Sequence, residues 1–266
     1  PEPGSPAPRT PEPRSPAPRE GKRALLARLL TERAQAPRTH PASFGQQRLW
    51  FLDRFAGGTA VYHIPVAFHL RGPVDETALR TALSTVVGRH EALRTSFAES
   101  GGEVVQIVHP SLTVPLEIID AAGATRDEGR ALAAETGRRP FDLATGPLLR
   151  AALIRLGPDE HVLTLVLHHI VSDAWSLGVL FTELNAAYTA ARDGRDPDLP
   201  PLPVQYADFA RWQRGQLGGE VLTGQLDYWL DHLRGAPALL TLPTDRSRPA
   251  VREHRGAVHY LTLPPA

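Results

Sequence analysis

An apolar segment at residues 161–170 ends in the side chains that are best suited to proton transfer in this sequence. His168 and His169 are adjacent there, and Asp173 follows within five residues. An imidazole titrates near neutrality, so a histidine can accept or release a proton at working pH. A strand end that leads through a loop into a helix is a common position for a catalytic group, because the scaffold beneath it is rigid.

Three interpretations of this segment remain open on its residues alone. In a structural interpretation, the histidines close a strand and Asp173 caps the next helix. A two-histidine, one-carboxylate metal site would need His168 and His169 together, but adjacent strand residues point to opposite faces. In an acyl-transfer interpretation, one histidine is the base and Asp173 organises the loop. The sequence has no GxSxG motif, so a serine-hydrolase triad has no anchor.

Composition limits the class of protein. The 266 residues are 42% hydrophobic, enough for a core, and 29 basic residues balance 29 acidic ones, so neither nucleic acid nor a membrane surface is an expected partner. The absence of cysteine removes disulfides, thiolate metal sites and thiol nucleophiles. No apolar run approaches the ~20 residues of a membrane span. We expect a cytoplasmic protein, and the proline-rich start without methionine suggests a piece of a longer chain.

The elements that must position the histidines follow from the hydrophobic pattern. Residues 148–156 and 161–167 are two apolar runs that predict a hairpin, and residues 62–71 alternate as a half-buried strand does. Ser43 and Gln46 form a capping-box pattern before a helix, and we expect Ser176 to cap another that stops at Gly194. Further strands are predicted at residues 95–98, 104–108, 114–119 and 257–263, and further helices from 75, at 126–136, 205–216 and 220–234. This order favours an α/β (α+β) two-layer sandwich.

The first residues differ in composition from the rest. Residues 1–20 repeat Pro-Ala-Pro-Arg units with almost nothing to bury, so they are expected to be a disordered linker. Residues 21–37 are predicted to form a linker helix, because their leucines fall on one helical stripe. The globular part is therefore expected to begin at residue 38.

Five segments resemble, in order, the motifs of condensation domains of nonribosomal peptide synthetases. They are SFGQQRLWFL (43–52), RHEALRTSF (89–97), HHIVSDAWS (168–176), YADFARWQ (206–213) and LPTDRSRP (242–249). Gly45 stands where the first family motif commonly has alanine, and Ala174 replaces the glycine of the HHxxxDG motif. The first motif favours the LCL subtype, which joins two L-configured residues.

The resemblance implies a fold and a reaction. The family consists of two chloramphenicol-acetyltransferase-like lobes with the active site between them. Residues 38–204 would form the N-terminal lobe, and residues 205–266 the crossover helices and a truncated start of the second lobe, so the fragment alone is expected to be inactive. The implied reaction is attack of an acceptor aminoacyl amine on a donor aminoacyl or peptidyl thioester.

The resemblance also implies the partners of the domain. Both substrates would be carried on the 4'-phosphopantetheine arms of upstream and downstream peptidyl carrier domains, and an adenylation domain would be adjacent. The domain itself would bind no cofactor directly and no metal. Two rival functions are a stand-alone acyltransferase of the same superfamily and a catalytically inactive, partner-recruiting condensation-like domain.

The HHxxxD motif supplies the expected site residues. The resemblance implies that His169 faces the tunnel and takes a proton from the amine or orients it, while His168 supports it. Asp173 would be structural, through an ion pair with one of two arginines of the second motif. Glycine at position 174 would allow positive φ and close approach of the substrate. The expected supporting residues are Ala174, Trp175, Arg89 and Arg94.

Overall fold

The computed structural model describes residues 21–240 and 242–247, and the chain forms two compact units, Pro1–Pro37 and Arg38–Ala266. In the first unit, helix α1 spans Lys22–Gln35, which confirms the helix predicted there. Its leucines, at positions 25, 26, 29 and 30, are exposed. The linker predicted at residues 1–20 lies outside the described residues.

In the second unit, a four-stranded sheet carries the two histidines. Its order is β2 (His63–Arg71), β7 (Glu160–His168), β6 (Leu149–Gly157) and β5 (Leu116–Asp120). The pairings are antiparallel except for β5 with β6, which is parallel. The predicted hairpin is confirmed as β6 and β7. These two central strands read as nearly continuous apolar runs because both of their faces are buried.

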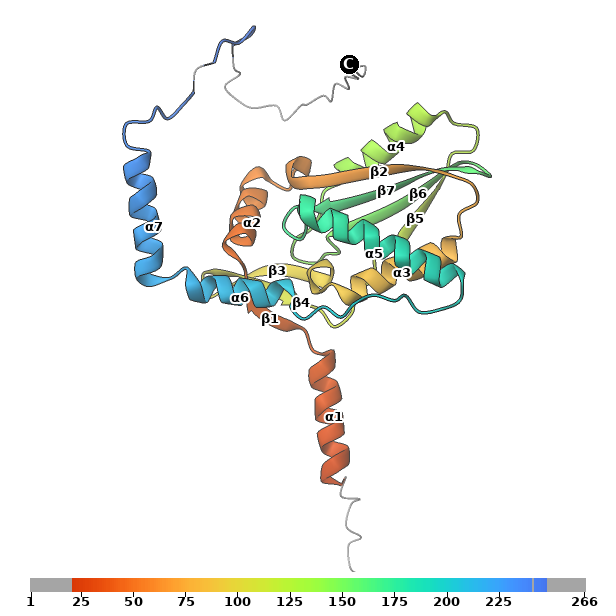
Figure 1. Cartoon of the computed structure of the whole chain (residues 1–266), viewed down its shortest axis with the longest axis horizontal. Helices are drawn as coiled ribbons and strands as arrows, with labels where there is room; N and C mark the ends of the chain where they lie inside the picture. The colour runs from red at the N-terminus through yellow and green to blue at the C-terminus, as the bar shows by residue number, and fades with distance from the viewer. Residues whose placement is uncertain (1–20, 241, 248–266) are drawn as a thin grey trace, which may run out of the picture. The chain divides into compact units, whose positions relative to one another are not determined.

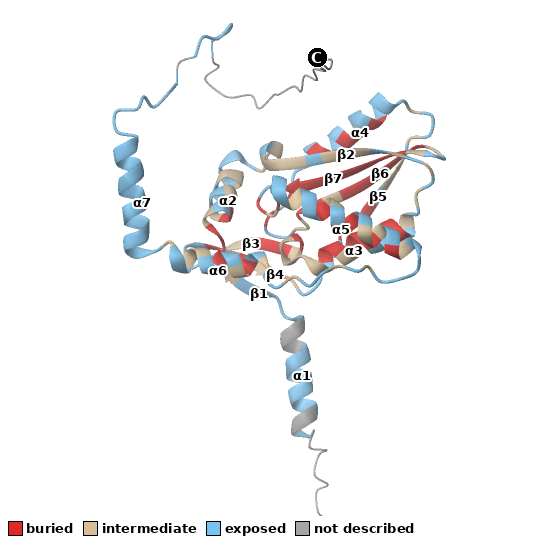
Figure 2. Ribbon diagram, viewed as in Figure 1, coloured by how far each residue is buried: buried red, intermediate tan, exposed pale blue. Residues whose placement is uncertain are grey.

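Helices cover both faces of this sheet (Figure 1). On one face, α3 (Glu76–Arg89) and α5 (Ala174–Arg192) pack against each other and against the central strands. On the other face lies α4 (Arg126–Arg138), which contacts β2, β6 and β7. Figure 2 shows that the buried residues are concentrated on β6 and β7 and on the sides of α3 and α5 that face them. The strand that ends in His168 is therefore held at the centre of the core.

A smaller antiparallel sheet has the order β1 (Arg38–Pro41), β4 (Glu103–Val108) and β3 (Thr95–Ser100). Its two longer strands are joined by Gly101 and Gly102, whose φ angles are 61° and 82°. Glycine adopts this left-handed backbone without steric cost, which allows the tight turn between the strands predicted at residues 95–98 and 104–108.

Helix α2 (Phe44–Ala56) begins with the predicted capping box. The Ser43 hydroxyl accepts from the Gln46 backbone N–H at 3.1 Å, and the Gln46 side chain accepts from the Ser43 N–H at 2.9 Å. The helix ends at Gly57 in the left-handed conformation, with φ of 71°.

Helix α6 (Tyr206–Gln216) is fixed against the start of α2. The Phe44 N–H donates to Gln213 Oε1 at 3.0 Å, and Arg214 Nε donates to the Ala42 carbonyl at 2.8 Å. These bonds join segments that lie far apart in the sequence. A bond from Gln205 Nε2 to the Arg89 carbonyl, at 3.1 Å, holds the residue before α6 near the end of α3. The remaining elements are the short helices η1 (Ala60–Tyr62) and η2 (Glu91–Arg94) and the exposed helix α7 (Gly219–His232).

The α/β fold class predicted from the sequence is confirmed, and one local prediction is wrong. Ser176 does not cap α5, because Asp173 is the N-cap residue and Ser176 is the third residue of the helix. The mistake arose because both residue types are good N-caps, and only three positions separate them. The strand predicted at residues 257–263 lies outside the described residues.

Candidate active site

The end of β7 separates the two histidines onto opposite faces of the sheet. His168 pairs with His63 as the last residue of the β2–β7 ladder, and the His169 N–H continues it by donating to the Tyr62 carbonyl at 2.8 Å. Because successive strand residues alternate in direction, His168 is fully buried, with 0% of its surface exposed, whereas His169 is exposed.

His168 is a buried, neutral imidazole that supports the loop after it. Burial, with smaller effects from His63 and His169, lowers its pKa to about 4. Its Nδ1 accepts from the Ile170 backbone N–H at 3.1 Å, so the proton of the neutral ring is on Nε2. That Nε2 has no hydrogen-bond partner within the described residues, and it lies 3.8 Å from Asp53 Oδ1.

Asp173 is exposed and acts as the N-cap of α5. Its Oδ1 accepts from the Ser176 backbone N–H at 2.8 Å and from the Ser176 hydroxyl at 2.7 Å, while the Asp173 N–H donates to that hydroxyl at 2.7 Å. These bonds from Ser176 lower the pKa of the Asp173 carboxyl below its ordinary value. The aspartate thus fixes the point at which the loop after His169 turns into the helix.

The predicted ion pair between Asp173 and an arginine of the second motif is wrong. Arg89 Nε donates to Glu183 Oε2 at 3.0 Å, and Arg89 also donates to the Pro200 carbonyl. Arg94 donates to the His109 carbonyl and lies 3.4 Å from Glu91. Both guanidinium groups are therefore engaged elsewhere.

Ala174 does not need the backbone freedom of glycine. It is the first residue of α5, and no residue other than glycine has positive φ in the described part of the chain. Alanine in place of the family's glycine is therefore accommodated in the helix without positive φ. Its neighbour Trp175 is 85% exposed and contributes to the wall of a pocket, which Ala174 does not.

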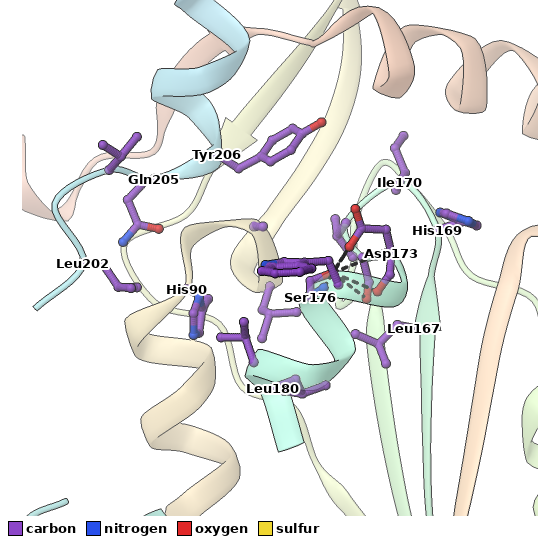
Figure 3. Close-up of a pocket in the computed structure, with 17 residues that line it drawn as sticks. His90, Leu167, His169, Ile170, Asp173, Ser176, Leu180, Leu202, Gln205 and Tyr206 are labelled. Carbon is purple, nitrogen blue, oxygen red and sulfur yellow. Dashed lines mark hydrogen bonds between the residues drawn. The ribbon is translucent and has the colours of Figure 1, made fainter. Parts of the chain in front are cut away.

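A pocket of about 390 Å³ lies beside the strand end (Figure 3). His169, Asp173 and Trp175 line it, and His168 does not. The remaining wall comes from the first turns of α5, from residues 90–93 after α3 and from residues 202–206 before and at the start of α6. A base that is presented at a rigid strand end next to an apolar pocket can remove a proton from a bound nucleophile.

Sequence reasoning did not identify several residues of this pocket. His90 lies in the second motif, where the prediction concerned only the arginines. Tyr206 begins the fourth motif, and its hydroxyl lies 3.0 Å from Ser43 Oγ. Leu202 and Val204 come from a proline-rich loop and carry no sequence signal. The sequence offers one signal that the second and fourth motifs meet at this pocket, namely that the motifs of one family occur here in the family's order.

Two other kinds of site are absent from the described residues. Within residues 21–240 and 242–247, no three histidine, aspartate or glutamate side chains gather as metal ligands would. Among the helices of the same residues, none combines the length and the apolar composition that crossing a bilayer requires.

The fold and the site define an α/β protein with an exposed histidine beside a pocket at the end of a buried strand, and its family follows from comparison. Residues 37–265 match the model of the Condensation domain family. The chain belongs to this family, as its motifs predicted. The match begins at the boundary of the second compact unit and includes the site.

Relatives of the chain are much longer proteins. A linear gramicidin synthase of Brevibacillus parabrevis is 49% identical over 228 residues, which are 84% of this chain and 3% of that protein. Phosphinothricin tripeptide synthetase PhsC of Streptomyces viridochromogenes is 47% identical over 229 residues, which are 84% of this chain and 21% of that protein.

A solved complex of the X-domain and OxyB from teicoplanin biosynthesis contains a similar chain, with a TM-score of 0.73 and 39% identity. The match covers 81% of this chain and 48% of the solved one, so the chain spans about half the length of that structure. The likeness confirms the predicted chloramphenicol-acetyltransferase-like lobe.

Replacement of Asp173 tests its role as a cap. We expect Asp173→Ala to lower the free energy of unfolding by about 1 kcal/mol, the usual cost of losing an N-cap, and to leave the protein folded. Asp173→Asn is the matched control and should recover most of the loss, since asparagine caps helices well. Urea denaturation measures both variants. A loss of about 3–5 kcal/mol in Asp173→Ala would instead indicate a broken buried ion pair.

The burial of His168 predicts a pH dependence of stability. Its pKa of about 4 in the folded protein lies below the ~6.5 of an unfolded chain, so the unfolded state binds more protons between these values. Stability should therefore fall as the pH is lowered from about 7 to 5, by about 2 kcal/mol from this residue.

The measurement is urea denaturation at both pH values. His168→Asn, which can still accept from Ile170 but does not titrate, should show a smaller loss than the wild type. The exposed His232→Gln control should keep the wild-type loss. An equal loss in His168→Asn and wild type would show that His168 is not a buried neutral histidine.

Proposed function

We propose that the chain is part of a condensation domain that forms a peptide bond in nonribosomal peptide synthesis. The observation that carries this proposal is the position of His169, which is exposed at the end of a buried strand and lines a pocket. Family membership supports it, since condensation domains form amide bonds by acyl transfer. One of the relatives named above is a tripeptide synthetase, and the other is a linear gramicidin synthase.

In the proposed reaction, the acceptor amine attacks the carbonyl carbon of the donor thioester. A C–N bond forms and the C–S bond breaks, so the peptide moves to the acceptor and the donor arm leaves as a thiol. His169 takes the proton that the amine loses, and the departing thiolate takes up a proton. General-base help of this kind contributes about 10²- to 10⁴-fold to a rate.

The surroundings of His169 suit this role. Its backbone is fixed by the bond to Tyr62, and the loop after it is held at both ends, by His168 and by the Asp173 cap. Such support keeps a catalytic side chain in place without using the side chain's own donors and acceptors. His168 and Asp173 are therefore assigned positioning roles, and the proton transfer is assigned to His169.

The wider assignments follow from the family. The substrates would arrive on 4'-phosphopantetheine arms of upstream and downstream carrier domains, next to an adenylation domain, in the cytoplasm. Residues 38–204 would be the N-terminal lobe and residues 205–266 would begin the second lobe. The LCL subtype remains a proposal that rests on the first motif.

A second candidate is a platform that recruits a partner enzyme. The observation in its favour is the 39% identity to an X-domain that was solved in complex with OxyB. The two candidates differ in whether His169 is needed for a reaction. The histidines and Asp173 of the HHxxxD motif are all present, which favours catalysis.

Removal of the His169 side chain tests the proposal. The whole domain, with both lobes, is supplied with a loaded donor carrier and a loaded acceptor carrier, and dipeptidyl thioester is detected by mass spectrometry. We expect His169→Ala to lower the rate at least about 100-fold and to keep the fold, because the side chain is exposed.

The matched control is His69→Ala, an exposed histidine outside the pocket, which should retain the wild-type rate. Full activity of His169→Ala would refute the role of His169. No product from the wild type, with carriers shown to be loaded, would favour the recruiting platform.

A further inference from the structure

One histidine of the pocket takes no part in the reaction proposed above. His90 follows the last residue of α3, and Figure 3 shows it on the side of the pocket away from His169. Its Nε2 lies 2.7 Å from Glu183 Oε2, on α5. Glu183 is only 7% exposed, and its Oε2 also accepts from Arg89 Nε at 3.0 Å.

This arrangement fixes which atom of the His90 ring is free. A carboxylate that takes a hydrogen bond from Arg89 is an acceptor, so the Nε2 of a neutral His90 carries the proton and donates it to Glu183. The Nδ1 then presents a lone pair. It makes no hydrogen bond within the described residues, and the His90 side chain is 23% exposed.

The segment beside His90 is held by the same network. Arg89 donates to the Pro200 carbonyl, and Gln205 Nε2 donates to the Arg89 carbonyl at 3.1 Å. The Glu91 N–H donates to Gln205 Oε1 at 3.0 Å. Because these bonds fasten the segment before α6 to the end of α3, this side of the pocket is preformed rather than built by the ligand.

The lining of the pocket that contains His90 includes several apolar side chains, namely Leu93, Leu180, Leu202 and Val204. A pocket of about 390 Å³ is within the range of small-ligand sites, which are commonly apolar with a few placed polar groups. His90 Nδ1 is such a group, because the nearby polar side chains already have partners. Glu183 accepts from Arg89, and Gln205 bonds to the backbone of residues 89 and 91.

We infer that the His90 side of the pocket is a subsite for the side chain of one aminoacyl substrate. The inference rests on the proposed function. The apolar wall suits the body of an aromatic side chain, and Nδ1 suits a hydrogen-bond donor at its end. The substrate class that fits both features is a hydroxyaryl amino acid, such as tyrosine, whose hydroxyl donates to His90.

The test compares tyrosine with phenylalanine, which differ only in the hydroxyl. Each is loaded on the acceptor carrier and, in a separate series, on the donor carrier, and kcat/KM is measured with the whole domain. In one of the two series we expect tyrosine to be preferred about 2- to 10-fold, the effect of one hydrogen bond.

The decisive variant is His90→Gln, whose amide can replace Nε2 toward Glu183 but not Nδ1. It should bring the tyrosine-to-phenylalanine ratio close to one. A purely structural role for His90 would leave the ratio unchanged, because Gln keeps the bond to Glu183. The matched control is His69→Gln, since His69 Nε2 lies 2.8 Å from Glu160 but outside this pocket, and it should keep the wild-type ratio.

A substitution that narrows the pocket provides an independent measurement. Leu202→Trp should lower kcat/KM for the tyrosyl substrate about tenfold more than for a glycyl substrate, because it fills the pocket. An unchanged relative rate in Leu202→Trp, or an unchanged ratio in His90→Gln, would overturn the subsite.

Failure of the proposed function gives a different result, namely no dipeptide from any pair of loaded carriers. The subsite is then tested by calorimetry with tyrosyl and phenylalanyl pantetheine amides. Tighter binding of the tyrosyl probe, lost in His90→Gln, would support the subsite even without catalysis. Equal binding of both probes by the wild type would refute it.

Discussion

The alternation of side chains at the end of a buried strand is the constraint on which the site depends. β7 lies between β2 and β6, and its ladder extends through His168 to the bond between the His169 N–H and Tyr62. A shift of the register by one residue would exchange the two histidines between core and pocket. The tight turn between β6 and β7 and the alternating, half-buried strand β2 oppose such a shift, so the sheet itself decides which histidine is exposed.

A second polar network supports the other side of the pocket. Hydrogen bonds of Arg89 to Glu183 and to the Pro200 carbonyl join the end of α3 to α5 and to the loop before α6. Gln205, which precedes α6, donates to the Arg89 carbonyl and so also joins the end of α3 to the start of α6. Arg89, one of the two arginines that were candidates for pairing with Asp173, is used here instead. Asp173 in turn needs no arginine, because Ser176 and the start of α5 satisfy it. Two local arrangements thus replace the single ion pair that was expected.

The features that could be predicted from the sequence are those that a few neighbouring residues determine. The capping box of Ser43 and Gln46, the hairpin of β6 and β7 and the opposite directions of His168 and His169 each depend on local spacing. Glu183 and Arg89 are 94 positions apart, and their pairing depends on how α3 packs on α5. The apolar wall at residues 202–204 depends on how the chain returns to α6. No local pattern encodes either contact.

The central claim is that the end of β7 exposes His169 to the pocket and buries His168 in the core. Carbethoxylation by diethyl pyrocarbonate, followed by peptide mapping, tests it directly, because the reagent needs access to a neutral ring nitrogen. The account predicts that His169 is modified in the folded protein near pH 7, that His168 is protected, and that both react in urea. Equal modification of the two histidines in the folded protein would contradict it.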